Sequence, residues 1–247
     1  MTSEVSSQKL LNALEIKAMA AGYGNVRVFE DVHISVLRGE FFGLVGLNGV
    51  GKTTLIKSLV SLRDEISGDI FISGKNRTEQ EAKRNIAYLP ERFDPPWFLT
   101  GEEFLKFSLE LYGQPFDQET VLEAVDKLAL DRAALKRKMH TYSKGMRQKL
   151  GLLGTILTNC SILILDEPMS GLDPMARTQV KDMLTKHKRE DQTIFLSSHI
   201  LADMDEICDR IAILHAREIK FVGTPKELKR VTKTDNLERA FLKHIEQ

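Results

Sequence analysis

One short segment constrains this 247-residue chain more than any other: Gly46-Leu47-Asn48-Gly49-Val50-Gly51-Lys52-Thr53, which matches the pattern G-x-x-x-x-G-K-[ST]. It lies between an apolar run of strand length and a segment of helical period, the context that the pattern requires in a phosphate-binding loop. Glycines let backbone N–H groups converge on phosphates, and the following helix N-terminus adds positive potential. These properties predict ATP or GTP binding, and the flanking strand and helix argue against a chance glycine-rich turn.

Two side chains of this loop are expected to contact the nucleotide directly. Lys52 can reach the β and γ oxygens, and the Thr53 hydroxyl can ligate Mg²⁺. Thr54 follows at the start of the helix, and we expect it to line the same site. The sequence at this point predicts binding of a nucleotide with Mg²⁺, and does not yet predict hydrolysis.

Composition indicates an ordinary globular protein without an overall basic charge. Hydrophobic residues make up 42% and charged residues 28%, and Lys+Arg and Asp+Glu both count 35, so no basic field indicates a nucleic-acid partner. Cys160 and Cys208 stand far apart beside apolar residues, and we interpret them as packing residues in a reducing compartment. The polar start, 1–9, does not resemble a secretory signal. No run of about eighteen apolar residues occurs, so any membrane role requires other chains.

Apolar runs of strand length alternate with segments of helical period, which favours a mainly parallel sheet covered by helices. The expected strands are 41–45, 86–89, 162–165, 193–197, 211–214 and 219–222. Between about 91 and 158 helical patterns dominate, so we predict an inserted helical subdomain there. A helix beginning at Thr224-Pro225 and a closing amphipathic helix around Phe241 are expected near the end.

Two acids follow the buried strand 162–165, at the edge where open α/β sheets bind ligands. We expect Asp166 to hold Mg²⁺ and Glu167 to accept a proton from the attacking water. The alternative is a strand that merely ends in a helix cap, a common use of Asp. The phosphate loop earlier in the chain favours the catalytic interpretation.

His199 comes after the next buried strand, behind two small hydroxyl residues. A lone histidine is more often a structural hydrogen bonder. A strand beside the one that carries Asp166 would instead bring the imidazole near a γ-phosphate, where it could stabilise developing charge. We therefore predict a catalytic role for His199 with Glu167 and Lys52.

The segment Thr141-Tyr142-Ser143-Lys144-Gly145-Met146-Arg147-Gln148-Lys149 opens a helix and resembles the signature sequence of ABC ATPases. Together with the phosphate loop, Asp166-Glu167, Ser170-Gly171-Leu172-Asp173 and His199, all in the family's order, it makes residues 14–228 similar to an ABC cassette. The resemblance implies a P-loop NTPase of the α/β class: a RecA-like core with an N-terminal antiparallel β portion and an inserted helical subdomain. The implied segments are 12–90 with 159–228 for the core, 91–158 for the helices and 229–247 for a C-terminal helix.

The resemblance also implies a dimer in which two cassettes enclose two ATP molecules head to tail. Ser143, Lys144 and Gly145 would face the γ-phosphate held by the partner, consistent with an anion-favouring helix N-terminus capped by Ser143. Asp173 would cross the dimer interface, although a helix N-cap role is compatible with this. Tyr23 would stack on adenine, and packing in a glycine-flanked turn remains the alternative. The dimer is expected to be a homodimer.

Departures from the family pattern point to one branch. Glu91 stands where most members have glutamine, and in the family this position approaches Mg²⁺. The signature also departs from the pattern, with Lys144 and Arg147 in place of glycine and glutamine. Both variants resemble ATPases serving exporters of drugs, sodium ions and surface polymers. The expected function is ATP hydrolysis that drives transport, most simply export, through transmembrane subunits at the cytoplasmic face of the cell membrane. The alternatives are a soluble ABC ATPase of DNA repair or translation, and a regulatory subunit that binds ATP without turnover.

The aromatic, proline-stiffened segment 91–99 is the expected coupling surface for the membrane partner. Soluble proteins seldom expose large apolar patches without a partner, and a cassette without a membrane span needs a groove for one. The alternative is that Phe93, Trp97 and Phe98 pack the core of the helical subdomain, since aromatic side chains usually lie in cores.

Overall fold

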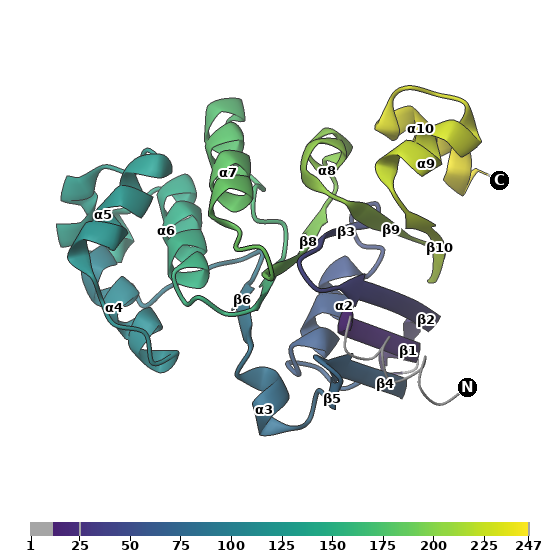
Figure 1. The fold of residues 1–247 in the computed structure, drawn as a ribbon, viewed down its shortest axis with the longest axis horizontal. Coiled ribbons are helices and arrows are strands. Elements are labelled where there is room, and N and C mark those ends of the chain that lie inside the picture. The colour runs from purple at the N-terminus through teal and green to yellow at the C-terminus, as the bar shows by residue number, and fades with distance from the viewer. Residues whose placement is uncertain (1–11, 25, 247) are drawn as a thin grey trace.

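A computed structural model describes residues 12–24 and 26–246 of the chain, which form two β-sheets and a set of covering helices (Figure 1). The expectation about residues 1–9 lies outside this part. The larger sheet has the strand order β10-β9-β3-β8-β7-β6, and all neighbours except β9 and β10 run parallel. Its strands are β3 (Phe41–Val45), β6 (Ile86–Leu89), β7 (Ile162–Leu165), β8 (Thr193–Ser198), β9 (Arg210–His215) and β10 (Glu218–Gly223).

The strands at the centre of this sheet are buried on both faces. Every residue of β3, β7 and β8 is buried, which is why these strands are continuous apolar runs and not alternating patterns. The predicted parallel sheet and each of its strands are thereby confirmed, with differences of at most one residue at the ends.

The smaller sheet is antiparallel and has the order β2-β1-β4-β5. Buried residues of both sheets form one hydrophobic cluster, which also takes in Leu55, Ile56 and Leu59 from the helix behind the phosphate loop. This cluster fixes the loop against both sheets. The elements are β1 (Asn12–Tyr23), β2 (Val26–Leu37), α2 (Lys52–Leu59), β4 (Ser67–Ile72), β5 (Lys75–Asn76) and α3 (Gln80–Lys83).

A group of helices occupies one side of the molecule, drawn in teal in Figure 1. They are α4 (Gly101–Leu111), α5 (Gln118–Lys127) and α6 (Lys144–Ile156), with short 3-10 turns at Arg132–Lys136 and Met139–Thr141. Each α-helix begins at a residue whose side chain accepts a backbone N–H: Thr100, Asp117 and Ser143. Their buried residues belong to a second cluster shared with the larger sheet. The exact division into 12–90, 91–158, 159–228 and 229–247 remains a prediction.

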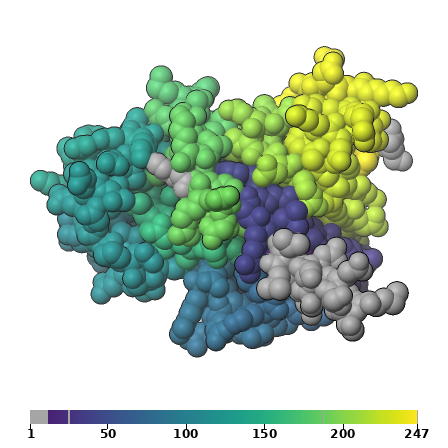
Figure 2. Space-filling view, viewed as in Figure 1, coloured from purple at the N-terminus to yellow at the C-terminus, as the bar shows by residue number. Residues whose placement is uncertain are grey.

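The remaining helices are α7 (Pro174–His187), α8 (Leu201–Ile207), α9 (Pro225–Thr232) and α10 (Leu237–Ile245). As predicted, α9 has proline in its first turn, and Thr224 and Glu227 form a capping box there. Figure 2 shows α9 and α10, in yellow, on the opposite side of the molecule from the teal helices. Within residues 12–24 and 26–246, no helix is long and apolar enough to cross a membrane. Cys160 and Cys208 are buried and unpaired, in agreement with their interpretation as packing residues.

Candidate active site

Four neighbouring strands deliver the predicted nucleotide-site residues to one edge of the larger sheet. Because β3, β8, β7 and β6 are parallel and adjacent, the segments that follow them emerge side by side. These segments border a cavity of about 480 Å³. Its lining consists of Asn48, Gly49, Gly51, Lys52, Thr53, Thr54, Glu91, Glu167, Ser170 and His199.

The phosphate loop can take its shape only with glycine at two positions. A Cβ on Gly46 would lie 2.6 Å from the carbonyl oxygen of Leu214, and Gly51 adopts a φ of 116°, which L side chains avoid. Val50 packs against the hydrophobic cluster of the two sheets, whereas Leu47 is half exposed. The loop is therefore held by packing on one side and open to the cavity on the other.

Lys52 is buried and bonded within its own loop. Its Nζ donates to the carbonyl oxygens of Gly46 at 2.8 Å and Leu47 at 3.4 Å, and it lies 3.3 Å from Oε1 of Glu167. A phosphate that recruited this ammonium would have to replace at least some of these oxygens. The lysine is thus buried at the cavity, with its Nζ held between two carbonyl oxygens of the loop and the Glu167 carboxylate.

Glu167 joins the lysine to the histidine. Its Oε2 lies 2.8 Å from Nδ1 of His199, and its side chain is almost fully buried while the imidazole is 41% exposed. The backbone of Glu167 has a φ of 48°, a left-handed conformation that costs a non-glycine residue about 1 kcal/mol or more. Strain of this kind persists where the surrounding structure holds a side chain in a required place, so it supports a functional position for this carboxylate.

Asp166 is fully buried, and only one of its carboxylate oxygens is hydrogen-bonded. The Ser197 hydroxyl donates to Oδ1 at 2.6 Å and accepts from the backbone N–H of Glu167 at 3.0 Å, while Oδ2 has no partner. Burial raises the pKa of Asp166, and the nearby hydroxyls of Ser197 and Thr53 oppose that shift. A buried carboxylate oxygen without a hydrogen-bond partner is a suitable ligand for a cation, and the Thr53 hydroxyl lies close to the same carboxylate.

Ser197 was not singled out from the sequence as a site residue. It fixes both acids, because one hydroxyl bridges the Asp166 carboxylate and the Glu167 backbone. The sequence did contain a signal for it. Ser197 is a hydroxyl residue near the end of a buried strand, and that strand was expected to lie beside the one that carries Asp166 and Glu167. Gln148 was missed in the same way: its buried amide donates to the carbonyl of Pro168 at 3.2 Å and so ties α6 to the segment after Glu167.

The donor set suits Mg²⁺ bound together with a nucleotide. The described part of the chain holds no group of three or more His, Cys, Asp or Glu side chains that could bind a metal alone. Mg²⁺ commonly takes one or two protein oxygens and completes its shell with phosphates and water. Thr53 and Glu91 line the cavity, and the partnerless Oδ2 of Asp166 lies just behind its lining, directly before Glu167 in the chain; together these oxygens fit that requirement.

The predicted signature residues lie elsewhere on the chain. They border a second cavity of about 490 Å³, whose lining includes Ser143, Gly145 and Asp173, and among the described residues none lines both cavities. The Ser143 hydroxyl accepts from the N–H of Met146 at 3.2 Å and caps α6, and Asp173 caps α7 by accepting from Ala176 at 2.9 Å. Lys144 is not among the lining residues, but its Nζ lies next to Gly171, which does line the cavity. The predicted phosphate-loop and signature residues therefore border two separate cavities of one chain.

Tyr23 ends β1 at the hairpin and is 54% exposed. The Arg63 guanidinium stacks 3.6 Å from the centre of its ring. The side chain of Thr54, followed by the charges of Arg63 and Lys57, lowers the pKa of this tyrosine. The ring therefore lies near Thr54 at the end of the phosphate loop but does not line the first cavity, so its adenine contact stays a prediction.

The aromatic segment 91–99 divides between the two alternatives. Phe93 packs edge-on against Phe104, with ring centres 5.3 Å apart, and belongs to the core. Trp97 and Phe98 are 69% and 56% exposed and contact each other edge-on. The core interpretation therefore holds for Phe93 and is wrong for the other two rings.

Comparisons with known proteins agree with this arrangement. The family model described as "ABC transporter" matches residues 29–170. A Synechocystis protein described as an uncharacterized ABC transporter ATP-binding protein is 40% identical over 206 residues, which cover 82% of this chain and 58% of the relative. The chain thus matches less than two thirds of that relative's length.

Two further matches cover their counterparts more fully. The lantibiotic transport ATP-binding protein SrtF of Streptococcus pyogenes is 29% identical, with 83% of this chain and 88% of the relative covered. A solved structure of an ATP-binding subunit of an ABC transporter superposes with a TM-score of 0.84 at 32% identity, over 94% of this chain and 99% of the other. The order of the motifs, the strand edge on which they meet and these matches lead to one conclusion: the chain belongs to the family of ABC transporter ATP-binding proteins.

Proposed function

We propose that this chain is the ATP-hydrolysing subunit of an ABC transporter and that it uses Mg²⁺. The observation that carries the proposal is the contiguous set Lys52, Glu167 and His199 at the mouth of the phosphate loop, with contacts of 3.3 Å and 2.8 Å through the glutamate. A binding site without turnover has no need of a buried carboxylate held in a strained backbone conformation.

Each group has a defined task in this mechanism. The N–H groups of the phosphate loop and Lys52 bind the β- and γ-phosphates, and Glu167 accepts the proton of the attacking water. The His199 imidazole, 41% exposed at the cavity, donates to the γ-phosphate oxygens as charge develops there. Thr53 and Asp166, with Glu91 nearby, hold Mg²⁺, which neutralises phosphate charge when bound. Tyr23 stacks on the adenine.

The second cavity supports a head-to-tail dimer of two such chains. Ser143 and Gly145 line it at the N-terminus of the 13-residue helix α6, where free N–H groups favour an anion. Lys52 and Glu167 lie at the other cavity, so a single chain lacks signature contacts to its own nucleotide. In the dimer, Ser143, Lys144 and Gly145 of each chain close on the γ-phosphate bound by the other, and Asp173 lies between the two sites.

Trp97 and Phe98 support docking to transmembrane subunits. They are exposed and adjacent, and the segment that carries them begins beside Glu91 of the first cavity. The same segment bonds to the approach to the signature, because Met139 N–H donates to the Leu99 carbonyl at 2.8 Å. A transmembrane partner bound to these rings at the cytoplasmic face would be linked through this segment to both half-sites. The variant residues Glu91, Lys144 and Arg147, together with the similarity to a lantibiotic transport protein, favour export.

The direct experiment measures phosphate release from ATP by the purified full chain, with and without Mg²⁺, over a range of protein concentrations. We expect Mg²⁺-dependent release whose rate per chain rises with concentration, because the composite site needs two copies. ATP binding without phosphate release at any concentration would favour the regulatory alternative. Purification from membranes in mild detergent would identify the transmembrane partner.

A further inference from the structure

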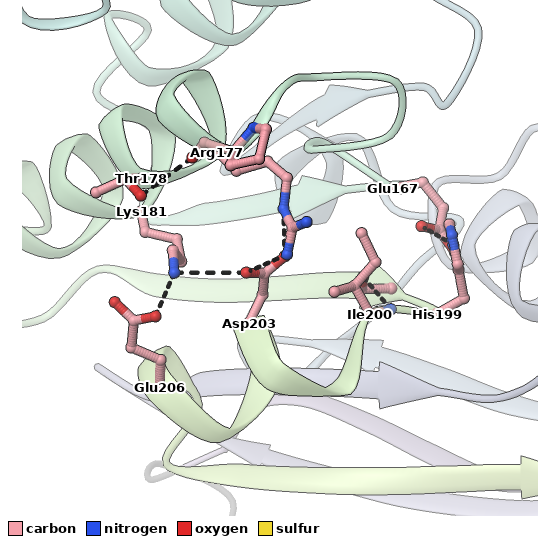
Figure 3. A network of polar contacts seen from close by, with 10 residues as sticks. Glu167, Arg177, Thr178, Lys181, His199, Ile200, Asp203 and Glu206 are labelled. Atoms are coloured by element: carbon pink, nitrogen blue, oxygen red, sulfur yellow. Dashed lines mark hydrogen bonds and ion pairs between the residues drawn. The ribbon is translucent and has the colours of Figure 1, made fainter. Parts of the chain in front are cut away.

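The two helices that follow the site motifs are joined by a ladder of charged side chains (Figure 3). Arg177 and Lys181 project from one face of α7, and Asp203 and Glu206 from one face of α8. The Arg177 guanidinium binds both oxygens of Asp203, with its Nη2 at 2.8 Å from each. Lys181 lies 3.4 Å from Asp203 and also contacts Glu206.

Asp203 is the buried member of this ladder. Its side chain is 2% exposed, against 25% for Arg177 and 12% for Lys181. A carboxylate desolvated to this extent is tolerated only with well-placed cations, and a forked guanidinium pair is the geometry that fixes orientation as well as distance. This carboxylate therefore ties α8 to α7 at a defined distance and orientation, in addition to the apolar contacts of the two helices with the core.

His199 lies immediately upstream of this clamp. It sits between the last residue of β8 and the first turn of α8, and the N–H of Ile200 donates to the Ser198 hydroxyl at 3.0 Å. With 41% of its side chain exposed, the imidazole is not fixed by packing around the ring. The contact of its ring with Glu167 therefore depends on the backbone before and after His199. The sheet holds the residue before it, and α8 holds the residues after it. Figure 3 shows His199 and Glu167 beside this network.

We infer that Asp203, through Arg177 and Lys181, is a positioning residue that holds His199 in reach of Glu167 and the γ-phosphate. Because Asp173, the N-cap of α7, lines the second cavity, the same clamp ties the catalytic imidazole of one half-site to the rim of the other. The inference rests on the proposed function for its catalytic consequence, while its geometric part stands on the contacts alone.

The kinetic test compares Asp203→Asn with Asp205→Asn in the full chain. Asp205 is an acid on the same helix that pairs with Lys229 of α9 at 2.8 Å, so the control removes a similar ion pair without touching α7. We expect Asp203→Asn to lower kcat for ATP hydrolysis about tenfold per folded molecule with KM within about twofold, and Asp205→Asn to stay within about twofold of wild type. Asp203→Glu, which keeps the charge, should recover most of the rate.

A second comparison separates positioning from general loss of structure. In a His199→Ala background, Asp203→Asn should cause no further loss of kcat, because no imidazole remains to be positioned. An equal tenfold loss in both backgrounds, or an unchanged kcat in the single variant, would overturn the inference.

An NMR measurement keeps the inference distinct from the proposed function. The ring resonances of His199, assigned with a His199→Gln variant, should shift in Asp203→Asn and not in Asp205→Asn. If wild-type chain binds ATP and releases no phosphate, the proposed function fails while this shift still supports the geometric clamp. Unchanged His199 resonances in Asp203→Asn would overturn the clamp whatever the ATPase result.

Discussion

The two cavities of this chain are nearly equal in volume and differ in almost every other respect. Two charged residues that line the first are buried and paired with each other: Lys52 and Glu167 are each 6% exposed and lie 3.3 Å apart, whereas Glu91 on the same lining is exposed. The named polar residues of the second, Ser143 and Asp173, are exposed helix caps. The first cavity is organised by four strand ends before any ligand arrives. The second is bordered by the N-termini of α6 and α7, whose free N–H groups favour an anion.

This difference predicts which substitutions should affect the isolated chain and which should matter only when two chains meet. Changes in the first cavity act on groups that the protein already holds at defined distances, so they alter chemistry and stability together. Changes in the second should leave the isolated chain almost untouched and appear only when two chains meet. The predictions that follow test this contrast.

The largest effect is expected from Glu167→Gln. The amide fills the same space beside Lys52 and His199 but cannot take a proton, so turnover should fall by about 10² to 10⁴-fold. ATP affinity should be retained, since a negative charge that competes for Lys52 is removed. Phosphate release and ATP binding are measured on the same preparation, with exposed Glu110→Gln as the control. Wild-type turnover would contradict the general-base role.

Ser143→Arg should break the second cavity while sparing the first. A bulky cation would replace the small cap that faces the cavity, so we expect turnover to fall about 100-fold or more through loss of dimer closure. ATP binding to the isolated chain should change by less than about twofold. Loss of the cap alone costs only about 1 kcal/mol, and Ser143→Thr, which keeps the hydroxyl, serves as the control. Concentration-independent hydrolysis at full rate by the arginine variant would sink the composite-site model.

Sequence alone predicted the larger sheet well because its strands are buried on both faces and leave long apolar runs. It also predicted the first cavity, since parallel neighbours bring their following residues to one edge. The contacts that tune the site were not predictable in this way. Ser197 bridging two acids and Asp203 gripping Arg177 depend on strand order and helix facing, which no local pattern encodes. The aromatic segment shows the same limit, because spacing could not separate core Phe93 from exposed Trp97.

Asp166→Asn should have opposite effects on stability and on metal dependence. Replacing a buried carboxylate whose Oδ2 lacks a partner removes a desolvation cost, so the nucleotide-free chain should gain about 1 kcal/mol in its free energy of unfolding. The Ser197 hydroxyl can still donate to the amide oxygen. The additional thermal stabilisation that Mg²⁺ gives to the ATP-bound wild type should disappear. Thermal unfolding with ATP, with and without Mg²⁺, measures both; an unchanged Mg²⁺ response would remove Asp166 from the metal site.

The smallest effect on the isolated chain is expected at Trp97 and Phe98, in the segment that begins with Glu91 of the first cavity. Trp97→Ser and Phe98→Ser remove exposed rings, so nucleotide affinity and thermal stability should change little, whereas recovery of the chain with its transmembrane subunit from membranes should drop several-fold.

Phe93→Ser is the matched contrast within the same segment. Its ring packs against Phe104 and above Gly151, so its loss should lower stability by about 3 kcal/mol, within the range for large-to-small core substitutions. Docking measured on the folded fraction of this variant should remain. Since Trp97 and Leu99 accept backbone hydrogen bonds from His140 and Met139 just ahead of the signature helix, a bound partner at these rings can move Ser143 while Glu91 stays at the nucleotide. If Trp97→Ser and Phe98→Ser variants assemble and support transport as the wild type does, the two half-sites must communicate with the membrane through another surface.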